Sequence, residues 1–494
     1  AMGTRNVNAR PTPNSGLHRC IPLVALGWIG AATAQTADEV ADAEREAPFQ
    51  PRITVSETYA SNVELAGEGF EQHDWITEVT PGFSLARTGS RLRYSVDYDL
   101  QALFYAEDGD RDDTYHTLWA DGQGELVQNR LFLDLEGRYG QRTLDPADRE
   151  AASNLYDTGN RTDVAALQVS PWYRERIGDL AEATLRYTFS RTDYRNTDES
   201  ESEFVEVEDS DINRIDASIG SPRTDGWTWR ADYMHNEVDF DESETYKYQR
   251  AGAELGIPVA ARTHFLLAGG AESDPLEDRS DDSMEESWWN VGIRMEPTSR
   301  QSFEFRTGDR YYGESYALHW RREGSRAVLA VDYTEEPSTS ALLEFDSSTT
   351  TQDGIYGFDR IDTDAYIRKY LAGSLTLALP RSEWSFRLYR DARDYDGRQP
   401  AEGRPERDDE DILGFSAHWR WRALARTWLE TGVRWESQDV TEGEADQGWF
   451  SVALVRDLTR HLEARLELRR IVRNSKAIRD YRDNSGLIGL RWLL

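Results

Sequence analysis

The feature of this sequence that most constrains its fold is a repeated alternation of apolar and charged residues. In the segment LFLDLEGRYG, Leu133 and Leu135 alternate with Asp134 and Glu136. Successive side chains of a β-strand point to opposite faces, so a period of two predicts a strand with one apolar and one charged face. Such segments recur from residue 52 to the end of the chain, and no segment of ten or more residues has the period of a helix.

Two kinds of connection separate these segments. The tight ones, rich in Gly, Pro, Asn and Asp, are 86–91, 127–130, 176–180, 221–226, 296–301, 322–326, 379–383 and 456–460. The longer, acidic ones are 106–113, 197–211, 274–287 and a stretch around 336–362. Short turns at one end and long loops at the other are typical of bacterial outer-membrane barrels, which have an even number of strands. The spacing predicts about 22 strands, within roughly 18 to 24.

A soluble β-sandwich would show the same alternation, because its apolar face meets a second sheet. The placement of tryptophan favours the barrel. Tryptophans on the apolar faces, mostly near strand ends, are Trp227, Trp229, Trp384, Trp419, Trp421, Trp435 and Trp492. Aromatic girdles at membrane interfaces have this distribution. We therefore predict an all-β fold, a transmembrane antiparallel up-and-down β-barrel, whose last strand, NSGLIGLRWLL, faces lipid to its final residue.

The beginning of the chain has the pattern of a secretion signal. Arginines precede the apolar run CIPLVALGWIGAATA, which ends in a small-residue cleavage motif, so residues 1–34 are predicted to be removed. A membrane-anchoring helix is the alternative, but the run is shorter than the roughly 20 residues that a spanning helix needs. Residues 35–50 form an acidic linker and 51–494 the barrel. We expect no plug domain, and no disulfide, because Cys20 is the only cysteine.

The first third of the predicted barrel shows a family resemblance. The runs ITVSETYASNVELA and DWITEVTPGFSLARTGSRLRYSVDYDLQALFYAEDGD lie within residues 52–145. This region resembles the outer-membrane barrel family associated with exosortase/PEP-CTERM systems of Gram-negative bacteria. The resemblance implies an outer-membrane location for the protein and a position of its gene among exopolysaccharide genes. It implies no catalytic residue, because the family has no assigned activity.

The sequence offers little for catalysis or metal binding. The histidines that remain after the signal are His73, His116, His235, His264, His319, His418 and His461. No two of them have a metal-ligand spacing, and GxSxG, HExxH and P-loop motifs are absent from the sequence. We predict no enzyme, no metal site and no cofactor. A hydrolase built from scattered rim residues is the least favoured alternative. Calcium binding by the acidic loops is less favoured than solvation or ion bridging to lipopolysaccharide.

Arginines on the charged face are the candidate lumen-lining residues. They are Arg93, Arg138, Arg186, Arg230, Arg294, Arg306, Arg387, Arg420, Arg434, Arg465 and Arg491. One interpretation is a cationic lining that attracts an anionic solute. The other is structural pairing with acidic residues on the same face, such as Asp97, Asp99, Asp134, Glu136, Asp232, Glu304, Glu463 and Glu467. We favour the second interpretation, and expect Arg420, Arg434 and Arg465 to share one stretch of lumen wall.

The predicted function is an outer-membrane channel or transporter associated with exopolysaccharide export or the handling of another envelope polymer. The alternative is a structural or assembly barrel that holds partners in the membrane. The predicted partners are outer-membrane lipid and lipopolysaccharide, an anionic polysaccharide and periplasmic export components, with no nucleic acid. The segment Thr197–Asp211 is expected outside the cell, because the short turns of such barrels face the periplasm.

Overall fold

The structure is a computed structural model that describes most of the chain from Phe49 onward. The described residues are 49–145, 148–151, 153–195, 207–223, 226–276, 283–345, 355–356, 363–395, 408–440 and 443–494. The predicted signal, residues 1–34, and nearly all of the predicted linker lie outside them. The expectation that no plug precedes the barrel concerns the same undescribed stretch. The first strand begins at Phe49, two residues before the predicted start of the barrel.

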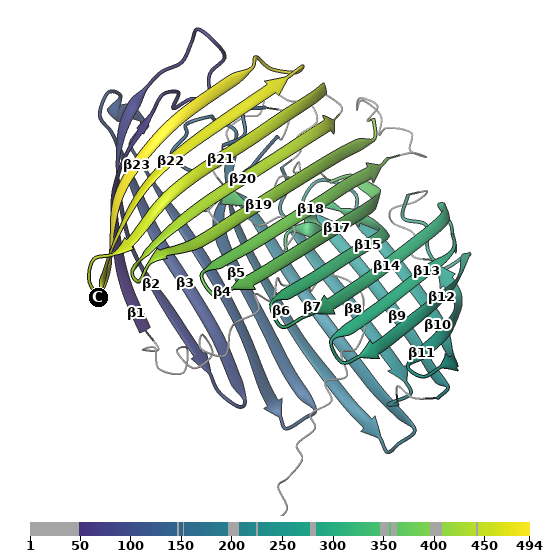
Figure 1. Cartoon of the computed structure of the whole chain (residues 1–494). Coiled ribbons are helices and arrows are strands. Elements are labelled where there is room, and N and C mark those ends of the chain that lie inside the picture. Colours follow the sequence, from purple (N-terminus) through teal and green to yellow (C-terminus); the bar gives the residue numbers. More distant parts are fainter. Residues whose placement is uncertain are drawn as a thin grey trace, which may run out of the picture.

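Strands make up almost all of the described regular structure (Figure 1). They are β1 (Phe49–Ala60), β2 (Asp74–Thr88), β3 (Leu92–Tyr105), β4 (Asp113–Val127), β5 (Leu131–Thr143), β6 (Arg161–Ile177), β7 (Ala181–Arg195), β8 (Ser210–Gly220), β9 (Thr228–Phe240), β10 (Tyr246–Ala260), β11 (Thr263–Glu272), β12 (Glu286–Thr298), β13 (Gln301–Arg310), β14 (Gly313–Glu323), β15 (Ala327–Thr339), β16 (Ile355–Tyr356), β17 (Ala365–Leu379), β18 (Ser382–Asp394), β19 (Glu410–Leu424), β20 (Thr427–Val440), β21 (Gly443–Asp457), β22 (Leu462–Ser475) and β23 (Tyr481–Leu493).

The strands close into one barrel. Each long strand pairs antiparallel with the next, and β23 pairs with β1 from Arg52 opposite Leu493 to Ala60 opposite Ser485. The sheet has 23 strands, and without the two-residue β16, which joins β5 in parallel, 22 remain in the wall. The predicted up-and-down barrel and its strand number are confirmed. Closure leaves no free sheet edge at the junction of the two chain ends, as a membrane-spanning sheet requires.

The two ends of the barrel differ as the sequence predicts. All eight predicted tight connections lie at one end, here called the turn end, next to the C-terminus. The opposite end, the loop end, carries connections such as 61–73, 144–160 and 340–364. Of the predicted acidic loops, residues 196–206, 277–282, 346–354 and 357–362 lie outside the described residues. The connection 144–160 is longer than the acidic loop 106–113, but neither periodicity nor an acidic run marks it in the sequence.

The outer surface of the barrel is apolar. In β22 the outward Leu466 and Leu468 are 53% and 66% exposed, while Glu467 between them is buried on the inner side. A soluble sandwich would cover such a face with a second sheet, so the exposed apolar surface excludes that alternative. Toward the loop end this surface gives way to outward ion pairs, such as Arg390 with Asp411. These charges mark one limit of the apolar band.

Helical structure is minor. The described residues contain two single-turn 3-10 helices, η1 (Gly109–Arg111) and η2 (Ser340–Leu343). None of the helices described is long and apolar enough to cross a membrane. The helix η2 begins one of the two connections that enter the barrel within the described part of the chain.

Candidate functional site

Two connections from the loop end fold into the barrel lumen. We call the described parts of 144–160 the β5–β6 segment, and the described parts of 340–364 the β15–β17 segment. The first packs against the inner wall near the junction of β1 and β23. The second crosses to β5, where Ile355 and Tyr356 pair with Gln141 and Arg142. Because β5 is ten places from β15 in a wall of 22 strands, that contact lies on the opposite side of the barrel.

The β5–β6 segment has an apolar side that joins a buried cluster on the inner wall. Its contributors are Ala151, Leu155 and Tyr156. The wall and neighbouring loop residues of this cluster are Ala60, Val63, Leu65, Ile76, Leu103, Tyr105, Trp449, Ile471 and Tyr481. These residues come from β1 to β3 and β21 to β23, so the segment covers both sides of the barrel junction. Burial of its apolar side chains favours the inward position.

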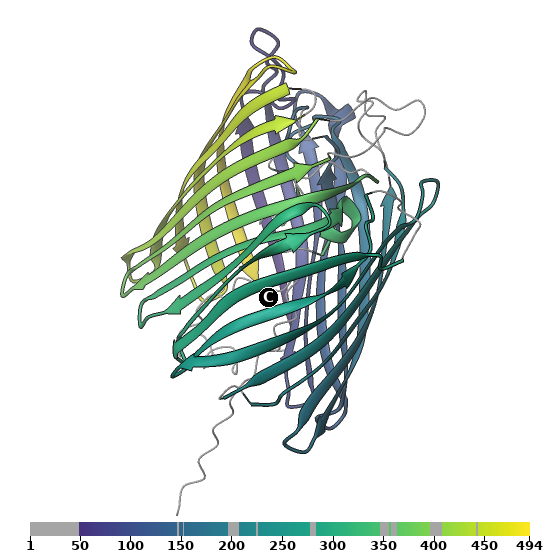
Figure 2. The same cartoon turned by 90° about the vertical axis from the view of Figure 1, so that its right-hand side faces the viewer.

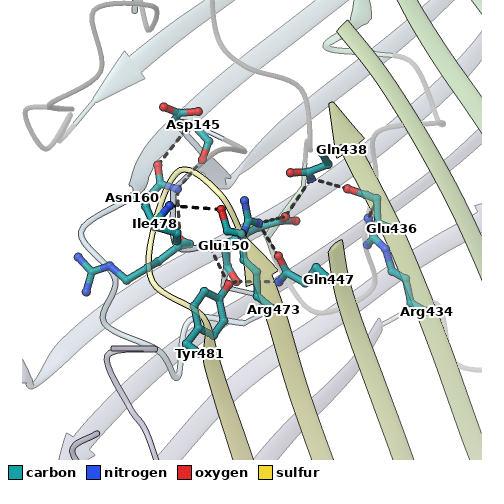
Figure 3. Close-up of polar contacts among 12 residues, drawn as sticks. Asp145, Glu150, Asn160, Arg434, Glu436, Gln438, Gln447, Arg473, Ile478 and Tyr481 are labelled. Carbon is teal, nitrogen blue, oxygen red and sulfur yellow. Dashed lines mark hydrogen bonds and ion pairs between the residues drawn. The ribbon is translucent and has the colours of Figure 1, made fainter. Parts of the chain in front are cut away.

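Glu150 is the polar anchor of the β5–β6 segment (Figure 3). Its carboxylate lies 3.7 Å from Arg473 Nη1 and accepts a 3.4 Å hydrogen bond from Gln438 Nε2. Its main-chain oxygen accepts from Gln447 Nε2 at 3.2 Å and from Tyr481 Oη at 3.3 Å. Glu150 is only 1% exposed. One residue of the segment therefore contacts four consecutive strands of the wall, β20 to β23.

The electrostatic surroundings of Glu150 favour its protonated form. Burial and the nearby Glu436 carboxylate together raise the pKa of the Glu150 carboxyl to about 7, although Arg434 and Arg473 oppose the shift. Glu436 is itself held by Arg434 at 2.8 Å. The anchor thus places two carboxyl groups near two arginines in a buried part of the lumen. A group with a pKa near neutrality changes its charge within the physiological range.

The β5–β6 segment is held at further points. Tyr156 donates a 2.9 Å hydrogen bond to Asp483 of β23, and Asn154 donates a 3.0 Å hydrogen bond to Gln101 of β3. The neck of the segment is closed by Asn160, whose Oδ1 accepts from the Asp145 N–H at 2.9 Å. The segment is therefore held inside mostly by side-chain contacts, with a main-chain hydrogen bond from the Asp157 N–H to the Val63 oxygen at 3.0 Å, and not by a strand ladder.

The β15–β17 segment is anchored to β5 by charge. Glu344 forms a 2.5 Å ion pair with Arg142, and both side chains are 1% exposed. The Glu344 carbonyl oxygen accepts a 2.9 Å hydrogen bond from Arg138, whose guanidinium lies 5.2 Å from the centre of the Phe345 ring. Where the segment leaves β15, Ala341 of η2 joins a buried apolar cluster with residues of β8 to β10 and β17. The lumen is therefore bridged as well as lined.

The strand register places all eleven predicted arginines on the inner face, opposite the exposed apolar positions of their strands. Seven form ion pairs with carboxylates of the wall. These pairs are Arg138 with Glu136 (3.6 Å), Arg186 with Asp134 (2.9 Å), Arg294 with Glu304 (2.6 Å), Arg306 with Glu304 (2.6 Å), Arg420 with Glu430 (3.2 Å), Arg434 with Glu436 (2.8 Å) and Arg465 with Glu430 (2.9 Å).

The other four arginines have different surroundings. Arg387 donates a 2.9 Å hydrogen bond to Tyr370, and Arg230 lies opposite Glu254 of β10. Arg93 and Arg491 are exposed near the turn end. The structure therefore brings most of the predicted arginines to carboxylates, and leaves two in the open mouth of the barrel.

The three arginines that were expected to share a wall converge in the structure. Arg420 and Arg465 contact the two oxygens of Glu430, at 3.2 and 2.9 Å, and Arg434 pairs with Glu436 farther along the same strand. Glu430 and Glu436 are not among the predicted partners of these arginines. Their inward positions follow from the same alternation that placed Arg434, so the period of two was a sufficient signal for their side of the wall.

Aromatic rings lie beside several inner-face arginines. Arg186 lies 5.4 Å from the ring centre of Trp172, and Arg434 lies 4.8 Å from that of Trp449. Such contacts order the guanidinium groups as well as the rings. Within the described residues, no three His, Cys, Asp or Glu side chains are gathered as a metal ion would require.

The fold has counterparts of low sequence identity among solved structures. No protein-family model matches the sequence, and no curated protein matches it. Among solved structures, a double mutant of the ferric enterobactin receptor PfeA of Pseudomonas aeruginosa is 10% identical with a TM-score of 0.46, over 91% of this chain and 81% of the receptor. The siderophore receptor PirA of the same organism is 9% identical with a TM-score of 0.43, over 91% and 80%. The ferripyoverdine receptor of its outer membrane is 12% identical with a TM-score of 0.44, over 91% and 72%.

The class of the protein follows from its own geometry. It is a closed antiparallel barrel with an apolar outer surface, a charged inner surface, short turns at one end and long loops at the other. In a bilayer every backbone polar group needs a partner, and a closed barrel supplies one for each strand. These are the features of an outer-membrane β-barrel of Gram-negative bacteria.

Proposed function

We propose that this chain is an outer-membrane channel whose lumen is opened and closed by the β5–β6 segment. The observation that carries the proposal is the way in which that segment is held. The ladders of β20 to β23 are continuous behind it, so the wall does not depend on the segment. Glu150 makes four of its polar contacts with the wall, and Asn154 and Tyr156 add others. A unit held by side chains can leave the lumen while the barrel stays closed.

The proposed solute is an envelope polysaccharide, with an acidic exopolysaccharide as the first candidate. The resemblance of residues 52–145 to the exosortase/PEP-CTERM-associated family supports a polysaccharide solute, because genes of that family are typically found among exopolysaccharide genes. The inner wall supports it chemically, because it combines paired arginines and carboxylates with rings such as Trp172 and Trp449. Sugar polymers present hydroxyl groups and flat apolar ring faces, which bind to polar and aromatic side chains respectively.

A structural or assembly barrel is the second candidate function. The observation in its favour is that seven of the eleven predicted arginines pair with wall carboxylates. Charges that neutralise each other hold a polar interior together and offer less to a passing anion. In this case the two inward segments serve to fill the lumen.

Conductance in planar bilayers separates the two candidates. For the channel, we expect low conductance of the purified protein and a marked increase in the variant Glu150→Ala, which loses the anchor. The control is Asp148→Asn in the same segment, because the Asp148 side chain is half exposed and does not hold the segment to the wall. Added alginate, an acidic polysaccharide, should block the current of the Glu150→Ala channel. A structural barrel gives no current in any of the three proteins.

A further inference from the structure

The seam between β14 and β15 has the shortest ladder in the described barrel wall, although residues 113–117 of β4 also lack partners on β5. Strands β14 and β15 pair only from Leu318 opposite Tyr333 to Glu323 opposite Val328. Residues 313–317 of β14 form no ladder with β15, although both strands lie wholly within the described residues. Beyond the seam, β15 continues to pair with β17 as far as Thr339, and β14 with β13 as far as Gly313. The turn-end half of the seam is therefore closed and the loop-end half is split (Figure 2).

Side chains bridge the split part of the seam. The carboxylate of Glu335 accepts a 3.1 Å hydrogen bond across the seam from the Tyr316 N–H, and another hydrogen bond from the Tyr333 hydroxyl of its own strand. The main-chain oxygen of Glu335 accepts from Arg310 Nη1 at 3.2 Å and from the Tyr312 hydroxyl at 3.1 Å. Glu335 of β15 thus makes three hydrogen bonds across the seam, with Arg310, Tyr312 and Tyr316, in place of a strand ladder. Such contacts can break and re-form without a change in register.

The sequence and the packing both favour the split. Pro337 has no N–H and cannot donate a ladder hydrogen bond, which is why proline in sheets is found at edges. The loop-end part of the β15–β17 hairpin is buried, with Thr339, Ala365 and Tyr366 fully covered. On β14, in contrast, the outward Tyr316 remains 40% exposed. The β15–β17 hairpin therefore leans toward the lumen at this height, while β14 stays in the wall.

The split lies at the height of one membrane leaflet. A strand residue rises about 3.3 Å, and barrel strands tilt by roughly 45°, so the six paired residues of β14 rise roughly 14 Å above the turn end. That is about the middle of an apolar band roughly 25 Å tall. With the turns facing the periplasm, the split part of the seam faces the outer leaflet.

We propose that the β14–β15 seam is a lateral opening through which an acyl chain of the outer leaflet reaches the lumen. The seam joins an apolar exterior to a polar interior, where His319 pairs with Asp332 at 3.0 Å just below it. A molecule with a polar head and an acyl tail fits both environments, with its head in the lumen and its tail in the seam. This inference rests on the proposed outer-membrane function, and it extends the solute class from free polysaccharides to amphiphiles that carry an acyl chain.

The test measures the access of lipid tails to an inner-face position at the seam. Single cysteines replace Ala317, Ser416 and Leu388 in a Cys20→Ser background, and each is labelled with a small fluorophore. Ala317 is an inner-face residue at the seam, opposite Arg306. Ser416 is an inner-face residue whose strand is paired on both sides, and Leu388 is outward and 49% exposed. The proteins are reconstituted in phosphatidylcholine vesicles with bromine atoms on the acyl chains, which quench fluorescence on contact.

The expected result is loss of fluorescence at positions 317 and 388, and none at 416. If position 317 behaves like 416 while 388 is quenched, the protein is in the membrane and the lateral opening is wrong. If 388 is not quenched, the barrel is not embedded and the proposed function fails with it.

Two substitutions of Glu335 extend the test. Glu335→Ala removes the bridging carboxylate and should increase the quenching at position 317, whereas Glu335→Gln keeps an acceptor oxygen for the Tyr316 N–H and should change it less. Heat-modifiable gel mobility shows that each variant is folded. Equal quenching in the folded Ala and Gln variants and the parent protein contradicts the role of Glu335 as the bridge.

Discussion

Glu150 shows how one residue can decide the state of a large lumen. Its side chain and main-chain oxygen contact the ends of four strands, and its carboxyl group lies near Glu436 as well as Arg473. The raised pKa means that the inward position binds a proton more strongly than a solvent-exposed carboxyl would. The contribution of this proton is fully present below the ordinary carboxyl pKa and is lost as pH rises through about 7.

The first prediction is a pH-dependent release of the β5–β6 segment. A shift from 4.5 to about 7 corresponds to a few kcal/mol of docking free energy, so the segment should leave the lumen more often at pH 8 than at pH 5.5. Trypsin cleavage after Arg149 reports the release. The rate for the parent protein, divided by that for Glu150→Gln at the same pH, should rise with pH. The division removes the pH dependence of trypsin, and a constant ratio would contradict the role of Glu150.

At the residue scale, the sequence predicts the strand face on which a side chain lies better than it predicts the residue with which that side chain pairs. The period of two places Arg420, Arg434 and Arg465 on one face. In the structure all three lie on the inner face and along the same stretch of the wall. The period does not show that Arg420 and Arg465 would share Glu430, because that pairing depends on strand tilt and on rotamers across three strands. Glu150 gives no signal at all, because it lies in a segment without periodicity.

At the element scale, the positions of the strands can be predicted from local sequence, because each strand needs only one apolar face toward the lipid. The two inward segments do not follow from local sequence. The hydrogen bond from Tyr156 to Asp483 joins residues 327 positions apart, and the Glu344 pair with Arg142 joins residues 202 positions apart. Contacts at such separations exist only after barrel closure. Pro337 is the one local sign of the β14–β15 seam, and proline also occurs in ordinary edge positions.

The second prediction concerns the outer face of β22. Leu468 lies six residues from the start of that strand, near the middle of the apolar band, and its outward side chain is 66% exposed. The substitution Leu468→Arg should lower the free energy of unfolding in vesicles by roughly 2–4 kcal/mol. The matched control is Leu458→Arg in the turn, where arginine reaches water and should cost about 0–1 kcal/mol. Urea titration in lipid vesicles measures both, and equal costs would place β22 outside the membrane.

At the scale of the whole molecule, closure between β1 and β23 fixes both chain ends of the barrel at the turn end. This arrangement, with the short connections beside it, predicts the orientation in the membrane. The third prediction is that Asp110→Cys at the loop end reacts with a membrane-impermeant maleimide on intact cells. Arg426→Cys at the turn end should react only after permeabilisation. The opposite labelling pattern would invert the barrel and move the seam to the inner leaflet.

The last prediction concerns the role of the inner-face arginines, which either stabilise the barrel wall through ion pairs or bind an anionic solute. Changing Arg420, Arg434 and Arg465 to Gln leaves Glu430 and Glu436 without their arginines. Partly buried carboxylates that lose their partners destabilise a structure by on the order of a few kcal/mol, so the unfolding temperature should fall. Changing both glutamates to Gln as well removes the unpaired charge and should restore much of the stability. Calorimetry and bilayer selectivity are measured on both variants. A triple variant with unchanged stability and a shift toward cations would instead show that these arginines face an open path for anions.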